Sequence, residues 1–158
     1  MKIRIVLDNI KKPYNMSAVL RVAVAVGARV YLTGDSIPWD HKKVLSRVQT
    51  WARSSQYNFS EFCFIYEDLE SLVEHLQLQN VELIGTSCDS GVPYYKTNFV
   101  KETAIVFGNE ESGLTKKKLN LMDSIITIPT KNGINSLNLS VAVGVISFEI
   151  VTQYSVFS

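Results

Sequence analysis

The apolar residues of the chain fall into short runs that alternate between two kinds of segment. Runs of about four or five residues rich in β-branched and aromatic side chains, closed by polar or glycine residues, are typical of buried strands. They predict strands over residues 3–7, 28–32, 62–66, 81–85, 104–107 and 125–128. Between them lie helical patterns, such as the apolar positions at i, i+3, i+4 and i+7 over 69–76. This alternation predicts an α/β fold with a mostly parallel sheet flanked by helices.

Two of the predicted helices are apolar almost throughout. The first, 17–26, follows the turn-like sequence KKPYN and stops at Gly27, where a helix C-terminus is favoured. The second begins near Ser136, after a loop rich in Gly and Asn. Ser136 has two interpretations: it caps a buried helix, or it holds a ligand beside the unpaired N–H groups of the first turn.

Length and composition narrow the class of protein. The sequence has 158 residues, 46% of them hydrophobic, and we expect residues 1–158 to form one domain. Its apolar runs are too short to span a bilayer, and charges lie near the N-terminus, so we expect a cytoplasmic protein without membrane contact. Cys63 and Cys88 have no histidine at ligand spacing, which predicts buried free thiols and no metal site.

Polar loops follow several of the predicted strands. The carboxyl ends of parallel strands meet at one edge of a sheet, where ligands bind. We therefore expect a site built from Asn15, Thr86, Ser87, 108–113 and 129–138. There is no glycine-rich dinucleotide or phosphate-loop motif and no nucleophile pair in these loops, which disfavours a small-molecule enzyme of those types. His41 and His75 lie in polar segments and are interpreted as surface residues.

Arg21 is the one charged residue of the first apolar helix. A buried arginine needs a partner, so its guanidinium has two interpretations. It forms an internal ion pair with Glu110 or Glu111, or it faces a pocket and holds a phosphate or a developing oxyanion.

Three stretches match the motifs of one family in the right order and at the right separation. They are NMSAVLRVAVAVG at 15–27, FGNEESGL at 107–114 and IPTKNGINSLNLSVA at 128–142. Together they resemble the SPOUT superfamily, and within it the TrmH/SpoU-type RNA 2′-O-ribose methyltransferases. Ser17 departs from the glycine usual in the first motif, and Thr130 from the methionine often found in the third.

This resemblance implies a C-terminal trefoil knot, a homodimer with its site near the subunit interface, and S-adenosylmethionine as the cofactor. It also implies site residues, matched position by position. The catalytic set is Arg21, Asn15, Glu110, Ser136 and Asn138. The cofactor is expected to contact Thr86, Gly108, Asn109, Gly113, Ile128, Thr130, Ser136 and Leu137.

The chemistry of methyl transfer suggests how these residues divide the work. The enzyme must align a ribose 2′-oxygen with the methyl group and help it lose a proton, which needs no metal. A guanidinium titrates above about 12, so Arg21 suits a clamp for phosphate and developing charge, and Glu110 is the better base by pKa. We predict an RNA 2′-O-methyltransferase, acting on tRNA as first choice and on rRNA as second. The alternative is a catalytically idle RNA-binding protein of the same fold.

The RNA-binding candidates lie in a basic segment with helical character from Pro38 to about residue 54. A net charge of +1 does not exclude RNA binding, because basic residues can gather on one face. Trp51 and Tyr57 either stack on a base or, as favoured, pack against the sheet. The phosphate-contacting candidates are Lys42, Lys43, Arg47 and Arg53, with Lys116, Lys117 and Lys118 as a second cluster; a solvated helix face is the alternative.

Overall fold

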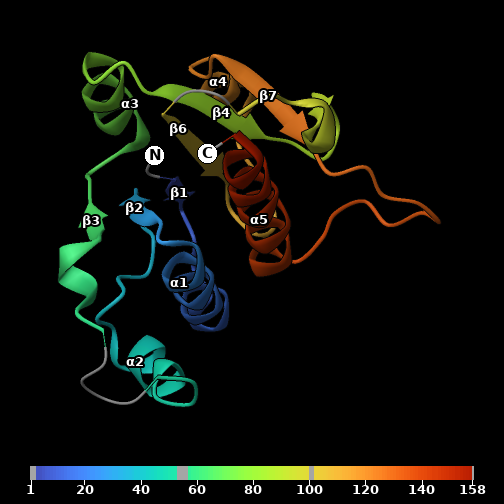
Figure 1. Ribbon diagram of the computed structural model, residues 1–158. Coiled ribbons are helices and arrows are strands. Elements are labelled where there is room, and N and C mark those ends of the chain that lie inside the picture. Colours follow the sequence, from blue (N-terminus) through green and yellow to red (C-terminus); the bar gives the residue numbers. More distant parts are fainter. Residues whose placement is uncertain (1–2, 53–56, 100–101, 158) are drawn as a thin grey trace.

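The computed structural model describes residues 3–52, 57–99 and 102–157. Over these residues, parallel strands form a seven-stranded sheet in the order β3-β2-β1-β6-β4-β7-β5 (Figure 1). The α/β fold and the parallel sheet predicted from the sequence are confirmed. The strands are β1 (Arg4–Asp8), β2 (Arg29–Thr33), β3 (Cys63–Ile65), β4 (Glu82–Thr86), β5 (Val92–Pro93), β6 (Thr103–Phe107) and β7 (Ser124–Thr127).

Helices cover both faces of the sheet. They are α1 (Pro13–Val26), α2 (Lys42–Val48), α3 (Leu69–Leu78), α4 (Lys116–Leu119) and α5 (Leu139–Phe157), with 3-10 turns η1 (Phe59–Glu61) and η2 (Tyr94–Lys96). Figure 1 shows α1, α2 and α5 on one side of the sheet and α3 and α4 on the other. Neighbouring side chains of β1 follow this division: Ile5 and Leu7 pack with α1, α2 and α5, whereas Val6 packs with α3.

The bounds of α1 and α2 differ from those predicted. The sequence KKPYN is not a turn, because Pro13 is the first residue of α1; the fixed φ of proline suits that position, and its missing N–H is no loss there. Gly27 ends α1 in the left-handed conformation (φ 66°), as its place predicted. The basic helix α2 is much shorter than expected and ends at Val48.

The last helix begins at a different residue from the one proposed as its cap. The side-chain oxygen of Asn138 accepts two hydrogen bonds from Ser140, one from its backbone N–H (2.9 Å) and one from the Ser140 hydroxyl (2.8 Å). The helix α5 therefore starts at Leu139, and the interpretation of Ser136 as the cap is wrong. Residues 128–138 lack helix and strand and extend away from the sheet between β7 and α5 (Figure 1).

The two cysteines differ in environment. Cys63 is buried in β3, and burial raises the pKa of its thiol to about 12. Cys88 is exposed, which contradicts the prediction of two buried thiols; it stands two residues beyond the end of β4 and so outside the core. No helix of the described residues is long and apolar enough to cross a membrane. The trefoil knot is not tested by the strand order and stays a prediction.

Candidate functional site

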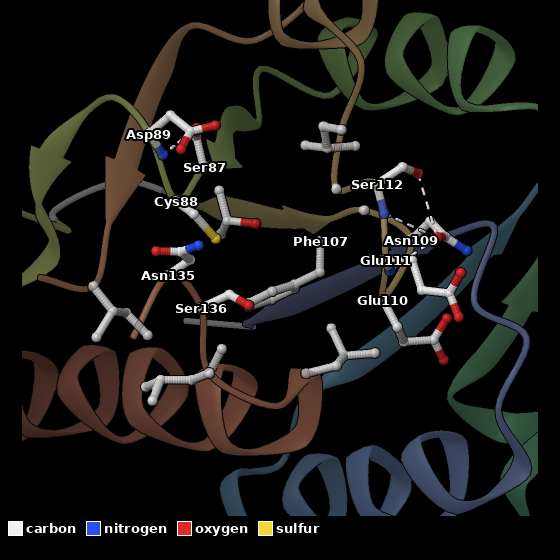
Figure 2. A pocket seen from close by; sticks show the side chains of 18 of the residues that line it. Ser87, Cys88, Asp89, Phe107, Asn109, Glu110, Glu111, Ser112, Asn135 and Ser136 are labelled. Atoms are coloured by element: carbon white, nitrogen blue, oxygen red, sulfur yellow. Dashed lines mark hydrogen bonds between the residues drawn. The ribbon is translucent and has the colours of Figure 1, made fainter. Parts of the chain in front are cut away.

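A cavity of about 320 Å³ lies at the carboxyl ends of β4, β6 and β7. Its lining comes from three loops and from the first turns of α5, so that segments far apart in the sequence meet here. Figure 2 shows the loop after β4, with Ser87 to Asp89, at one end and the loop after β6, with Glu110 to Ser112, at the other. The lining residues are 86–89, 107–114, Ile126, Ile128, 135–137, Leu139, Ala142 and Ile146.

The loop after β6 is held closed by one asparagine. Asn109 accepts hydrogen bonds on Oδ1 from the backbone N–H groups of Glu111 (3.0 Å) and Ser112 (3.2 Å), and donates from Nδ2 to the carbonyl of Asn9 (2.8 Å). The loop folds back so tightly that a Cβ at Gly108 would overlap the backbone of Gly113. Glycine at 108 is therefore required by the loop itself.

We expect Gly108→Ala to lower the free energy of unfolding by roughly 1–3 kcal/mol, because backbone atoms must shift to admit the methyl group. The matched control is Gly144→Ala in α5, where a Cβ would lie 3.9 Å from Val22 in ordinary contact. Alanine there should raise stability by up to about 1 kcal/mol through helix propensity. Urea denaturation of both variants checks this; equal effects would contradict the close approach at Gly108.

The side chain of Glu110 extends from this loop to the start of α1. Its Oε1 accepts hydrogen bonds from the Lys12 N–H (3.0 Å) and from Asn15 Nδ2 (3.1 Å), and its Oε2 accepts one from the Lys11 N–H (3.2 Å). Asn138 Nδ2 in turn donates to Asn15 Oδ1 (3.2 Å). The side chains of Asn138, Asn15 and Glu110 thus form a hydrogen-bonded chain that joins all three sequence motifs.

These hydrogen bonds also lower the pKa of the Glu110 carboxyl. Burial alone would raise the pKa of this carboxyl, but the bonds from the Asn15 side chain and from the backbone N–H groups of Lys12, Glu110 and Lys11 outweigh it and lower the pKa. A carboxylate with a lowered pKa and occupied lone pairs is a poor proton acceptor. The sequence favoured Glu110 as the general base, and this environment argues against that role. It supports a role in positioning Asn15 instead.

The lowered pKa has a consequence for stability. Glu110 stabilises the folded chain above the unfolded value of 4.5, and this contribution is lost as the pH falls through the folded pKa. We expect Glu110→Gln to be less stable than the unaltered protein at pH 7 and the gap to narrow near pH 3. Chemical denaturation at both pH values measures it. Glu111→Gln is the control: its carboxylate is 82% exposed and lies 3.6 Å from Lys12 Nζ, so its removal should matter little.

Arg21 does not join this chain of side chains. It is exposed on α1, and within the described part of the protein it forms no ion pair with Glu110 or Glu111, so that alternative is excluded. Arg21 is six positions after Asn15, which turns its side chain about 120° around the helix from that of Asn15. The guanidinium is left open to an anion from outside the chain.

Most of the residues predicted to contact a cofactor line the cavity. Seven do so: Thr86, Gly108, Asn109, Gly113, Ile128, Ser136 and Leu137. Thr130 does not, because its hydroxyl donates to the Ile134 carbonyl (2.5 Å) and closes a turn of the long loop. Asn135 lies within the stretch 129–138 that the sequence selected, whereas sequence reasoning missed Cys88 and Asp89, the two residues that follow Ser87.

The predicted RNA-binding residues have mixed positions. Lys42, Lys43 and Arg47 are exposed on α2, whereas Arg53 lies outside the described residues. In the second cluster Lys118 Nζ pairs with the buried Asp8 (2.6 Å), and Lys117 Nζ lies 3.7 Å from Glu70. Lys118 is therefore a structural residue.

The aromatic candidates are partly buried and pack against the core. Trp51 Nε1 donates to Ser17 Oγ (3.1 Å), and its ring lies 6.1 Å from that of Tyr57 and 6.4 Å from that of Phe59. Packing, the favoured interpretation of Trp51 and Tyr57, is what the structure shows.

These features define an α/β protein with a ligand cavity at the carboxyl ends of a parallel sheet and an Asn–Asn–Glu chain beside it. The model of the SpoU rRNA Methylase family matches residues 2–148. The chain belongs to this family, which confirms the resemblance read from the three motifs.

Individual relatives agree with this assignment. The 23S rRNA (guanosine-2′-O-)-methyltransferase RlmB of Ralstonia nicotianae is 31% identical over 152 residues, which cover 96% of this chain and 59% of that protein. RlmB of Shewanella oneidensis is 30% identical over 153 residues, covering 94% of this chain and 58% of that protein. The chain thus spans about three fifths of the length of these curated relatives.

Solved structures share the fold. The SpoU methyltransferase AviRb from Streptomyces viridochromogenes in complex with the cofactor AdoMet has a TM-score of 0.82 at 23% identity, covering 98% of this chain and 58% of that one. A protein studied for 2′-OH methylation of C/U34 on tRNA has a TM-score of 0.83 at 23% identity, and the match covers 98% of this chain and 97% of that one.

Proposed function

We propose that the protein is an S-adenosylmethionine-dependent RNA 2′-O-ribose methyltransferase. The observation that carries this proposal is the hydrogen-bonded chain of Asn138, Asn15 and Glu110 beside the cavity of about 320 Å³. It brings one polar side chain from each motif of the SpoU family to the same place. The cytoplasmic location expected from the sequence is part of the proposal.

The cavity suits the proposed cofactor in size and chemistry. Its volume of about 320 Å³ lies at the lower end of the range of about 300–1,000 Å³ common for ligand pockets. Phe107, Ile128 and Leu137 offer apolar surface to an adenine ring. The charged side chains among its lining residues are all carboxylates, those of Asp89, Glu110 and Glu111, which favours a ligand with positive charge. S-adenosylmethionine, when bound, supplies an electrophilic methyl group on a positively charged sulfur.

The protein side chains then have separate tasks. Asn15 is 2% exposed and is held from both sides, by Asn138 and by Glu110, and of these three residues Glu110 lines the cavity. Arg21 would bind an RNA phosphate and stabilise the negative charge that develops on the ribose 2′-oxygen. Glu110 would act through Asn15 as a positioning residue, and Ser136 would contact the cofactor from the wall of the cavity.

We favour a tRNA loop as the substrate and rRNA as the second choice. The first choice draws on the fold shared with the protein studied for 2′-OH methylation of C/U34 on tRNA. The second choice draws on the RlmB relatives, which by name are 23S rRNA methyltransferases.

The outer face of α5 supports the expected homodimer. Val141 (50% exposed) and Phe148 (51% exposed) lie on one side of a helix whose opposite side, with Val143 and Ile146, is buried in the core. A helix that is apolar all round is normally covered on all sides, and a second copy of this chain would cover the remaining face. Analytical ultracentrifugation of the protein and of Phe148→Glu tests the proposal; equal mass for both would contradict it.

Calorimetric titration with S-adenosylmethionine is the test of the proposed function, followed by incubation of the protein with labelled cofactor and separated tRNA and rRNA. We expect binding and 2′-O-methylation of an RNA, and mapping of the modified ribose identifies the substrate. Absence of cofactor binding would overturn the proposal and favour an RNA-binding protein without catalytic activity.

A further inference from the structure

An exposed aromatic residue directly precedes Asn15 on α1. Tyr14 belongs to the first turn of α1 and is 60% exposed, whereas its neighbour Asn15 is 2% exposed and bonded to Glu110. A large ring left in water at the start of a helix contributes little to the stability of the fold. Its position next to the site calls for a different explanation.

A cation covers part of the Tyr14 ring. The guanidinium of Arg47 in α2 lies over the ring, 5.5 Å from its centroid. Such a contact orients the ring. The aromatic surface that remains open is then held by two helices, α1 and α2, in a fixed place.

The surroundings of the ring carry positive charge. Lys43 is one turn before Arg47 on α2, and Arg21 is two turns after Tyr14 on the same side of α1, about 10 Å along the axis. All three basic side chains are exposed, and none forms an ion pair among the described residues. An aromatic ring amid unpaired cations is the combination that binds single-stranded RNA through stacking and phosphate contacts.

We propose that the Tyr14 ring, backed by Arg47, is a platform on which an unpaired nucleobase of the RNA substrate stacks. The inference rests on the proposed function, because it assigns a recognition residue to the same RNA. Tyr14 takes the role that the sequence left open for Trp51 and Tyr57, whose rings pack against the core. Tyr14 and Arg21 lie on the same side of α1, so together they would hold the strand along that side of the helix.

The test is the affinity for fluorescein-labelled oligouridylate, measured by anisotropy at several salt concentrations. We expect Tyr14→Ala to weaken binding about 5- to 150-fold, the range for loss of one base stack, without change in the salt dependence. Tyr14→Phe should bind like the unaltered protein. Arg47→Gln should in addition reduce the slope of log affinity against log salt by about one, because it removes a phosphate contact or a nearby cation.

The matched control is Tyr95→Ala, which removes a tyrosine of similar exposure (54%) from η2. Its RNA affinity should not change. The proposal is overturned if the protein does not bind oligouridylate, if Tyr14→Ala binds as well as Tyr95→Ala, or if Tyr14→Phe loses as much affinity as Tyr14→Ala. Cofactor binding is measured separately by calorimetry, so failure of methyltransferase function, seen there, is distinct from failure of the stacking platform.

Discussion

Arg21→Ala is expected to lower the rate of methyl transfer about 100- to 1,000-fold, the usual cost of removing one donor that stabilises a developing oxyanion. The guanidinium is exposed on α1 and has no ion pair with Glu110 or Glu111, so nothing in the described chain neutralises it. Since Arg21 does not line the cavity, the affinity for S-adenosylmethionine should not fall with the rate. Single-turnover methylation of the identified RNA, with calorimetry of cofactor binding, measures both.

Arg21→Lys separates charge from geometry. Lysine keeps one positive charge but lacks the planar group that binds a phosphate through two parallel hydrogen bonds. We expect this variant to recover part of the lost rate, and Arg21→Gln to recover none of it. Near-normal turnover of Arg21→Ala would show that the 2′-oxygen is activated elsewhere, and the role assigned here to Arg21 would be wrong.

The fold and the place of the site follow from local patterns in the sequence. Apolar runs of strand length recur at intervals that a parallel sheet requires, and the polar loops after them mark the edge where the cavity lies. Gly27 was placed at a helix end because glycine tolerates the left-handed conformation that it adopts there. These features depend only on residues that are neighbours in the sequence, so they can be predicted from it.

Contacts between distant residues could not be predicted in this way. Ser136 and Asn138 are both able to cap a helix, and only the fold shows that Asn138 does so and also bonds to Asn15. Glu110 appears in sequence as a carboxylate with an ordinary pKa. Two of its donors, the N–H groups of Lys11 and Lys12, lie 99 and 98 residues away in the sequence. Their hydrogen bonds help to make this candidate base a positioning residue.

Lys118 is another residue whose role could not be predicted from its neighbours. In the sequence it belongs to a run of three lysines that is typical of an RNA-binding cluster. Its ammonium lies 2.6 Å from Asp8, whose side chain is 3% exposed and also accepts a hydrogen bond from Thr33 (2.8 Å). We expect Lys118→Ala to lower the free energy of unfolding by about 3–5 kcal/mol, because a charged Asp8 would remain buried without its partner. Urea denaturation at pH 7 measures the loss.

The neighbouring lysine provides the control for that experiment. Lys117 is 84% exposed and lies 3.7 Å from Glu70, so Lys117→Ala should cost no more than about 1 kcal/mol. Removing both charges of the pair, in Asp8→Asn with Lys118→Met, should restore most of the stability lost in Lys118→Ala, since no unpaired carboxylate is left buried. If Lys118→Ala were as stable as Lys117→Ala, the ion pair would not hold α4 to the end of β1, and Lys118 would again be available to RNA.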